Sequence, residues 1–230
     1  MTSAKKFDDA DQYEREIRIL VPGYDALHAM VPAVLGAALP TCRRVLVVGC
    51  GPAHEAVTIA HTLTGCTIDA IDPSPAMADA ARATVRDAAL TERVRVAAAS
   101  LHDVGEEGAF DAAVATLVGH FVPDDGKRAE FLGDLARSLR PGGIAVLSEF
   151  EDVGPARDWV TEAHLRCSQA AGLPAQRATI MRERLSRGFH GLTRARLGEL
   201  ADAVGLSVTG EFFRSFGFVG LVLRKEPHSG

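Results

Sequence analysis

The sequence predicts an α/β fold: a doubly wound, mostly parallel sheet of seven strands that ends in an antiparallel hairpin. Short apolar runs alternate with stretches of helical periodicity, which is the pattern of strands joined by crossover helices. A turn containing two glycines follows the first apolar run, and only Arg214 and Ser215 separate the last two runs. So short a connection joins antiparallel neighbours, because parallel strands need a long crossover. The 230 residues suffice for one such core.

The first two thirds of the chain are expected to supply the parallel strands and the helices between them. Strands are predicted at 45–48, 67–71, 94–99, 111–117 and 144–150, where short apolar runs are bounded by glycine, proline or charge. Helices are predicted at 53–63, 75–89 and 127–139. Ser74 followed by Pro75 is typical of a helix start, because the hydroxyl caps free N–H groups and proline fits the first turn.

The last third departs from this alternation. A helix is expected at 155–171 and an irregular, arginine-rich stretch at 174–192. Thr193 is then expected to cap a helix that ends near Gly205. Two strands, 206–213 and 216–223, complete the sheet as the antiparallel hairpin.

Composition limits the classes of function. A net charge of −5 argues against broad, nonspecific binding of nucleic acid, which needs a basic surface to displace counterions. No apolar stretch reaches the ~20 residues of a membrane span, so we expect no membrane association. The N-terminus lacks the pattern of a signal peptide, and the four cysteines show no CxxC spacing. We therefore expect a cytoplasmic protein with free thiols and no metal site.

The turn after the first predicted strand indicates a nucleoside site. Gly49 and Gly51 reach backbone angles closed to other residues and leave room for a ligand. Asp72 follows the second strand, where a carboxylate can accept hydrogen bonds from both ribose hydroxyls. His54 stands where a dinucleotide site needs a third glycine, which favours a nucleoside without pyrophosphate. An ordinary turn and a capping aspartate remain the structural alternatives.

Four segments carry a resemblance to a known family: Val-Pro-Gly-Tyr at 21–24, Ile-Asp-Pro-Ser-Pro-Ala-Met at 71–77, Pro-Gly-Gly-Ile-Ala-Val-Leu-Ser-Glu at 141–149 and Phe-Phe-Arg-Ser-Phe-Gly-Phe at 212–218. With them the chain resembles the class I S-adenosylmethionine-dependent methyltransferases. Within that class it is similar to the bacterial tRNA wobble-uridine carboxymethyltransferases and to related small-molecule methyltransferases of bacterial secondary metabolism. The resemblance implies a Rossmann-like methyltransferase fold with S-adenosyl-L-methionine as the methyl donor.

The resemblance also implies a set of donor-binding residues. They are Tyr24, Gly49, Gly51, Asp72, Pro73, Met77, Ser100, Leu101 and Thr116. Tyr24 would close over the amino-acid end of the donor, Leu101 would offer its amide to the adenine, and Thr116 would face the methionine part.

The chain departs from this family pattern at three positions. Ser100 replaces an acidic residue, and Thr116 replaces an asparagine. Ala178 stands where the tRNA enzymes use an arginine to bind the extra carboxylate of carboxy-S-adenosylmethionine, and Arg177 is one residue away. Because a carboxylate needs a fixed guanidinium, we expect the plain donor.

Fewer signals identify the acceptor side. Methyl transfer needs a general base only when the acceptor starts protonated. His120, beyond the fourth strand, and Tyr24 are our catalytic candidates. The candidates for substrate binding are Arg18, His28, Glu149, Arg177 and His190. Packing or solvated roles remain open for each of them.

These predictions divide the chain into four parts: an N-terminal helical lid at 1–40, an S-adenosylmethionine-binding core at 41–153, a helical insertion over the acceptor site at 154–193, and a C-terminal helix and hairpin at 194–230. The leading hypothesis is methyl transfer to a small-molecule nitrogen or oxygen acceptor, in a biosynthetic pathway. A tRNA-modifying enzyme and a noncatalytic S-adenosylmethionine-binding protein are the alternatives. The resemblance also makes a homodimer plausible.

Overall fold

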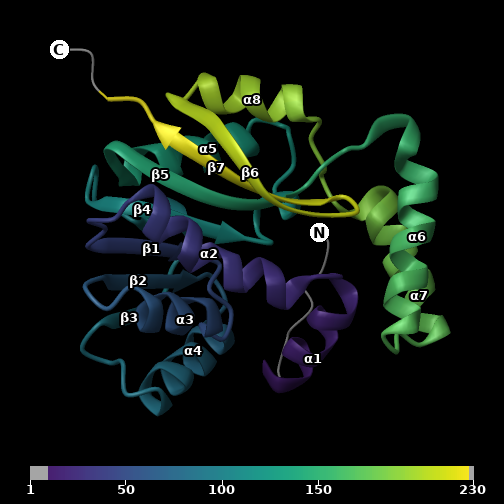
Figure 1. Ribbon diagram of the computed structural model, residues 1–230, viewed down its shortest axis with the longest axis horizontal. Helices are drawn as coiled ribbons and strands as arrows, with labels where there is room; N and C mark the ends of the chain where they lie inside the picture. Colours follow the sequence, from purple (N-terminus) through teal and green to yellow (C-terminus); the bar gives the residue numbers. More distant parts are fainter. Residues whose placement is uncertain (1–9, 228–230) are drawn as a thin grey trace.

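The computed structural model describes residues 10–227, with side chains from residue 15, as an α/β molecule around one seven-stranded sheet (Figure 1). The strand order is β3-β2-β1-β4-β5-β7-β6. The strands are β1 (Arg44–Val48), β2 (Thr67–Asp72), β3 (Val94–Ala98), β4 (Phe110–Thr116), β5 (Leu139–Phe150), β6 (Leu206–Ser215) and β7 (Phe218–Lys225). Strands β1 to β5 run parallel, and β7 pairs antiparallel with both β5 and β6. The predicted fold class is therefore confirmed.

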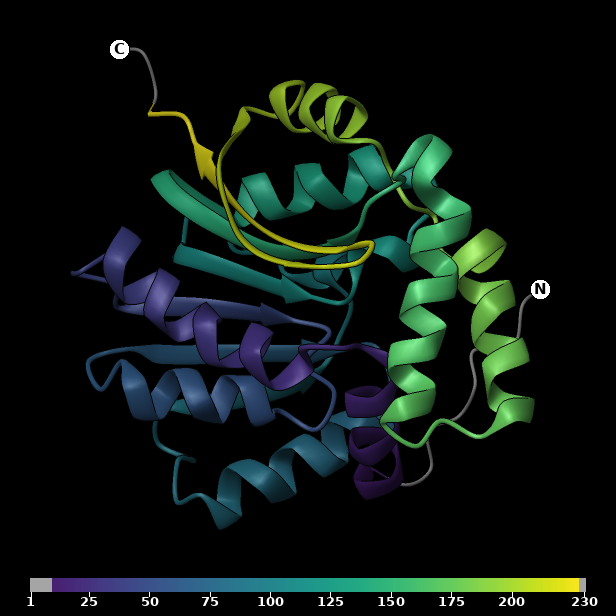
Figure 2. The ribbon, with the colours of Figure 1, turned by 45° about the vertical axis from the view of Figure 1, so that its right-hand side comes forward.

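Helices cover both faces of the sheet (Figure 2). One face is covered by α2 (Tyr24–Ala38), α3 (His54–Thr62) and α4 (Pro75–Asp87), and the other by α5 (Lys127–Ser138) and α8 (Arg194–Asp202). Along β1, Val45 and Val47 pack on the first face, whereas Leu46 and Val48 pack on the second. This alternation follows from the pleat of a strand. Burial on both faces explains why the strand sequences are continuously apolar.

A third group of helices lies beyond the carboxyl ends of the parallel strands, at the right of Figure 1. It contains α1 (Ala10–Leu20), α6 (Arg157–Ala170) and α7 (Ala175–Glu183). Leu165 of α6 packs with Met181 of α7, and Leu20 of α1 packs against the same cluster. Residues 1–9 of the predicted N-terminal lid lie outside the described residues. The two parts of the chain expected over the acceptor therefore meet each other at this end of the sheet.

The stretch 174–192 is more regular than the sequence indicated. It forms α7 and then a π-helical turn, η4 (Arg184–Gly188), where an irregular segment was expected. Ala178, Met181 and Leu185 recur at helical spacing and are buried together. The high arginine content hid this apolar stripe, and packing against α6 supplies the stabilisation that the local sequence lacks.

The hairpin turn also differs from its expected position. It lies at Phe216 and Gly217, because Ser215 pairs with Phe218, and not at Arg214-Ser215. A Cβ atom at Gly217 would lie 2.6 Å from the ring of Phe150, so only glycine lets the turn cross that ring. The position of the turn is thus set by a contact with a distant strand.

Strand β5 begins at Leu139, earlier than the expected 144, and includes the Pro-Gly-Gly sequence at 141–143. The pairing of β4 with β5 shifts register opposite this sequence. A Cβ atom at Gly143 would lie 2.9 Å from the carbonyl oxygen of Asp111, so the irregular pairing depends on a glycine. No helix in the described part of the chain has the length and apolar character needed to cross a membrane.

Candidate functional site

The order of the strands locates a crevice at the carboxyl edge of the sheet. The chain leaves β1 toward β2 on one side and returns to β4 on the other, so the order reverses between β1 and β4. In open α/β sheets, ligands bind at such a reversal, outside the carboxyl ends of the strands. The Gly49–Gly51 bend follows β1, and Thr116 ends β4. The predicted donor residues therefore lie on both sides of the reversal.

Asp72 fastens the bend that follows β1. Its Oδ2 atom accepts a hydrogen bond from the Gly51 amide at 3.0 Å, and its Oδ1 atom accepts one from the Ser74 amide at 2.8 Å. A carboxylate oxygen has a second lone pair, so both oxygens retain acceptor capacity for a ligand. The turn-forming role and the ligand-binding role proposed from the sequence are therefore compatible.

Both glycines of this bend have backbone angles that favour glycine, but the space around them differs. Gly49 has φ 65° and Gly51 has φ 49°, both in the left-handed region. A Cβ atom at Gly49 would lie 2.6 Å from the Val118 side chain, whereas a Cβ atom at Gly51 would meet no described atom within 4 Å. The space beside Gly51 is open, as a bound ligand requires.

The other predicted adenosine-side residues follow β2 and β3. Pro73 lies between Asp72 and Ser74, and the Met77 amide donates to the Ser74 hydroxyl at 3.4 Å. Leu101 begins η1 (Leu101–Asp103) and is buried. These residues flank the end of β2.

Ser100 directly precedes η1. Its hydroxyl donates to Asp103 Oδ2 at 2.6 Å, and this hydrogen bond lowers the pKa of Asp103. The Asp103 carboxylate therefore lies beside Ser100, although the resemblance to the family did not point to Asp103. The serine that replaces the family's acidic residue therefore has an acidic neighbour.

Thr116 is part of a chain of polar side chains that the sequence did not reveal. Its hydroxyl donates to the Glu55 carboxylate, with both oxygens at 2.8 Å, and Nδ1 of His28 lies 2.8 Å from Glu55 Oε1. The ring of Tyr24 lies 4.2 Å from that of His28. Helices α2 and α3 and strand β4 thus converge on one buried carboxylate at the strand reversal.

Glu55 gave only a weak sequence signal. It is in the first turn of α3, where the positive end of the helix favours an acidic residue at any exposed site. Only the fold brings it to Thr116, 61 residues away. It is the main ligand-facing candidate that the sequence missed.

Glu149 lies on the opposite face of the sheet from Thr116. It continues the row of Ala145 and Leu147 that faces α5, and its Oε2 atom accepts from Nη1 of Arg128 at 2.8 Å. Arg128 is fully buried, and its other N–H groups donate to the carbonyl oxygens of Val122 and His190. Burial raises the pKa of Glu149, and the neighbouring guanidinium opposes this shift. The sequence identified Glu149 but not its arginine.

His120 is enclosed by aromatic rings. Those of Phe121, Phe189 and Phe218 lie 4.3, 4.5 and 5.8 Å from it. Burial, together with the charge of Arg128, lowers the pKa of His120 to about 3, so its ring is neutral at physiological pH.

His190 meets His120 through the backbone. The His190 amide donates to the His120 carbonyl oxygen at 2.8 Å, while the His190 side chain is exposed. The two predicted histidines are therefore neighbours, although their rings play different structural roles.

The two predicted arginines lie among the covering helices. Arg18 donates to Asp25 at 2.8 Å, and its guanidinium lies 5.9 Å from the centre of the Tyr24 ring. Arg177 of α7 forms an ion pair with Glu16 of α1. Arg177 therefore ties the two covering segments together.

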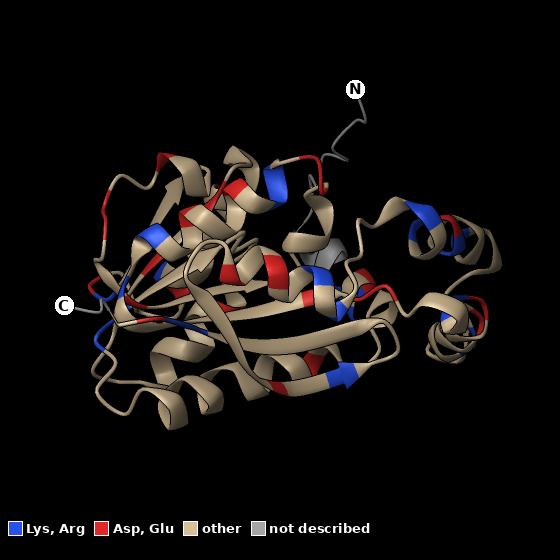
Figure 3. Ribbon diagram, turned by 90° about the horizontal axis from the view of Figure 1, so that it is seen from above, with Lys and Arg blue, Asp and Glu red and all other residues tan. Residues whose placement is uncertain are grey.

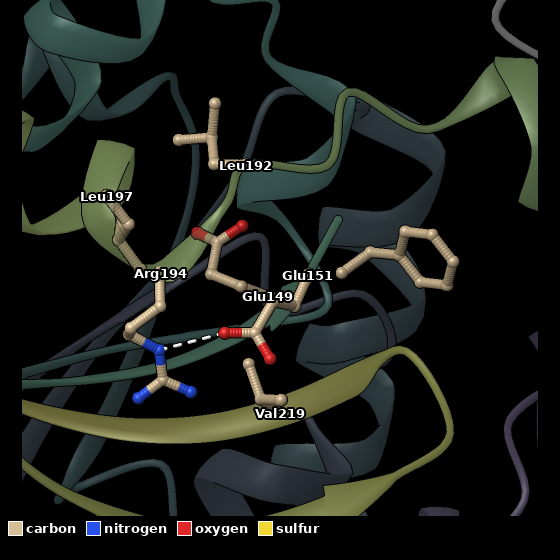
Figure 4. A pocket seen from close by; sticks show the side chains of 7 residues that line it. Glu149, Glu151, Leu192, Arg194, Leu197 and Val219 are labelled. Carbon is tan, nitrogen blue, oxygen red and sulfur yellow. Dashed lines mark hydrogen bonds and ion pairs between the residues drawn. The ribbon is translucent and has the colours of Figure 1, made fainter. Parts of the chain in front are cut away.

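Two pockets adjoin the end of β5. The first lies toward α8, and an Arg194–Glu151 hydrogen bond of 2.9 Å crosses it (Figure 4). The second lies between β5 and the covering helices and is partly open to solvent. Phe150 and Phe189 line it together with Arg157 and Thr161 of α6. Among the described residues, no group of three or more His, Cys, Asp or Glu side chains is placed to hold a metal ion.

Comparisons with known proteins agree with this geometry. A family model described as "Methyltransferase domain" matches residues 45–143. The carboxy-S-adenosyl-L-methionine synthase of Aeromonas salmonicida (strain A449) is 32% identical over 173 residues, which cover 72% of this chain and 69% of the relative. The protein of the same name from Geobacter metallireducens is 29% identical and covers 89% of this chain and 85% of the relative.

Solved structures share the fold at lower identity. The 1,6-didemethyltoxoflavin-N1-methyltransferase of Burkholderia thailandensis, with bound 1,6-didemethyltoxoflavin and S-adenosylhomocysteine, has a TM-score of 0.61 at 21% identity. The match covers 87% of this chain and 79% of that one. The mitomycin 7-O-methyltransferase MmcR has a TM-score of 0.64 at 14% identity and covers 87% and 53%.

Proposed function

Because this chain belongs to the class I S-adenosylmethionine-dependent methyltransferases, we propose that it transfers the donor's methyl group to a nitrogen or oxygen atom of a small-molecule acceptor, as a step of a biosynthetic pathway. S-Adenosylmethionine is its cofactor and supplies an electrophilic methyl group on a sulfonium. The protein's own contributions are to bind and orient the two reactants and to exclude water.

The residues at the strand reversal fit this cofactor. Asp72 keeps acceptor capacity for the ribose hydroxyls, and the space beside Gly51 is open. Glu55 and Thr116 form a polar lining beyond the glycine bend, and the Glu55 carboxylate suits the α-ammonium group of the donor.

The observation that carries the small-molecule proposal is the pairing of the insertion's arginines. Four of the six arginines between 177 and 196 form ion pairs within the described part of the chain: Arg177, Arg182, Arg194 and Arg196. Figure 3 shows basic and acidic residues side by side on the covering helices. Cations already paired with carboxylates release few counterions on binding a phosphate backbone. This supports a small acceptor over tRNA.

A neighbouring enzyme adds support for a small acceptor. The Burkholderia thailandensis methyltransferase holds 1,6-didemethyltoxoflavin together with S-adenosylhomocysteine in the same fold. In the present chain, the pocket between β5 and the covering helices, which Phe150 and Phe189 line together with Asp152 and Arg157, is the candidate site for a compact acceptor.

Carboxy-S-adenosylmethionine chemistry is the second candidate function, favoured by the name of the relatives at 29–32% identity. A guanidinium that is free to form a bidentate pair is the side chain best suited to bind an extra carboxylate. Arg177 is engaged by Glu16, and Ala178 is buried among apolar side chains of α6 and α7. These two facts support the plain donor.

One experiment separates the candidates. The purified protein is incubated with methyl-labelled S-adenosylmethionine and either a bacterial metabolite extract or total tRNA. We expect S-adenosylhomocysteine to form and the label to appear in a small molecule. Label in tRNA supports RNA modification, and a donor that gains a carboxyl group supports the second candidate. Absence of S-adenosylhomocysteine with every acceptor supports the noncatalytic alternative.

A further inference from the structure

Three histidines have a buried ring nitrogen without a hydrogen-bond partner among the described residues. The atoms are Nε2 of His28, Nδ1 of His120 and Nδ1 of His164. A buried polar atom left unpaired costs stability, so each needs an explanation. The contacts recorded around each ring distinguish the three histidines.

His164 and His120 have packing roles in the fold. Nε2 of His164 lies 2.8 Å from the Leu20 carbonyl oxygen, so it must carry the proton, and the ring joins α6 to the end of α1. His120 is surrounded by phenylalanines, and burial lowers its pKa to about 3. No carboxylate among the described residues is recorded at either ring.

His28 differs because its Nδ1 atom lies 2.8 Å from Glu55 Oε1. A carboxylate at Nδ1 holds the proton there and leaves the lone pair on Nε2. Nε2 is the unpaired buried atom of this ring. A histidine oriented by a carboxylate, with its second nitrogen free to accept, is the arrangement of a general base.

We propose that His28 is the general base of methyl transfer and that Glu55 is its positioning residue. The proposal rests on the proposed function and assigns to His28 the proton that an N–H or O–H acceptor must lose.

The surroundings of His28 place it beside the expected donor site. Glu55 also accepts from Thr116 at the end of β4, so the pair lies at the strand reversal where the donor is expected. The Tyr24 ring packs 4.2 Å from the imidazole and restricts its rotation. The charged groups recorded around the imidazole are Glu55 and, behind the Tyr24 ring, Arg18.

The step balances without a further reactant. The N–H or O–H bond of the acceptor breaks, and its proton goes to Nε2 of His28. The electron pair left on the acceptor atom forms the bond to the methyl carbon, while the pair of the broken carbon–sulfur bond stays on sulfur in S-adenosylhomocysteine. The imidazolium that results is neutralised by Glu55 and releases its proton to water.

The first test needs no acceptor. In protein labelled with ¹⁵N-histidine and saturated with S-adenosylhomocysteine, long-range ¹⁵N–¹H spectra identify which nitrogen of His28 carries the proton. We expect Nδ1–H with a bare Nε2, and a mixed population of tautomers in Glu55→Gln. A His28 protonated on Nε2 in the native protein overturns the proposal, because that nitrogen then has no lone pair to offer.

The second test measures turnover to S-adenosylhomocysteine with catechol, 4-nitrophenol and lumazine as probe acceptors, across a range of pH. We expect His28→Gln to lower kcat by about a hundredfold or more with catechol, the weakest acid, and less with 4-nitrophenol, which ionises unaided. Glu55→Gln lowers kcat less and changes the pH profile. The exposed His61→Gln in α3 is the matched control and retains native activity.

The outcomes distinguish a failure of the His28 assignment from a failure of the proposed function. A His28→Gln enzyme with native kcat and only a raised KM for the donor overturns the base assignment. So does a greater loss in His120→Gln than in His28→Gln. If the native protein turns over none of these probes or the metabolite extract, the proposed function fails, and the tautomer experiment still decides the state of His28 independently.

Discussion

Two buried glutamates lie at the carboxyl edge of the sheet, one on each face, and their partners differ. Glu149 faces α5 and is held by Arg128, a fully buried permanent cation. Glu55, in the first turn of α3, lies on the face covered by α2 and α3 and is held by a hydroxyl and an imidazole. A pair with a permanent cation fixes structure, because its charge state hardly changes. A carboxylate beside an imidazole can respond to proton transfer, as the reaction of a protonated acceptor requires.

The largest effect is expected on the Glu149 face. Arg128→Met leaves a buried carboxylate without its cation, and we expect a loss of about 3–5 kcal/mol in the free energy of unfolding, measured with urea. Arg82→Met removes an exposed ion pair with Asp79 and should cost less than about 1 kcal/mol. An Arg128→Met protein as stable as Arg82→Met would contradict this account of the buried pair.

The same variant has a predicted pH dependence. Burial raises the pKa of Glu149 in the folded state, and removing Arg128 raises it further. A carboxyl group with a raised folded pKa binds more protons when folded, so its contribution to stability is greatest at low pH and is lost as pH rises through that pKa. The penalty of Arg128→Met should therefore be smaller at about pH 5 than at about pH 8. A pH-independent penalty would indicate that the lost hydrogen bonds to carbonyl groups dominate.

Gly119 tests how closely Glu149 is packed. A Cβ atom at this glycine would lie 1.9 Å from Glu149 Oε1, so Gly119→Ala must displace the buried carboxylate. We expect a loss of about 1–3 kcal/mol in urea unfolding. Gly198→Ala is the matched control, since a Cβ atom there meets no described atom within 4 Å and alanine stabilises helix α8 by about 0.5–1 kcal/mol. If both substitutions changed the free energy of unfolding in the same direction, the close packing of Gly119 on Glu149 would be refuted.

The smallest effect on stability is expected on the Glu55 face. Glu55→Gln keeps the shape of the side chain and leaves no permanent charge unpaired, so it should cost about 1 kcal/mol or less. Glu149→Gln, by contrast, strands the buried Arg128 and should cost severalfold more. Thermal melting of the two variants, in parallel with the native protein, checks this ratio. Equal losses would remove the distinction between the two glutamates.

The sequence predicted those features that depend on local chemistry. Buried strands, the capping Ser74 and the glycine bend follow from periodicity and backbone limits within a few residues. Asp72 was found because its place at a strand end is itself a local signal. The local structure that carries the predicted donor residues was therefore largely predictable.

The remaining features depend on contacts between distant segments. Glu55 meets Thr116 across 61 residues, and Arg128 meets Glu149 across 21. In the sequence, Glu55 and Arg128 resemble ordinary charged residues near the start of a helix. The position of the hairpin turn was likewise set by Phe150 packing over Gly217, which no local pattern specifies. The residue types predicted the helices and strands. The pairs Glu55–Thr116 and Arg128–Glu149 form only when those helices and strands pack together.

The proposed function depends on an adenosyl ligand held by Asp72 at the strand reversal. Isothermal calorimetry of S-adenosylhomocysteine with the native protein and with Asp72→Asn tests this directly, with thermal melting as a check that the variant is folded. We predict binding to the native protein and a loss of affinity of about tenfold or more in Asp72→Asn, equivalent to about 1.4 kcal/mol. Equal affinities, or no binding to either protein, would contradict the account.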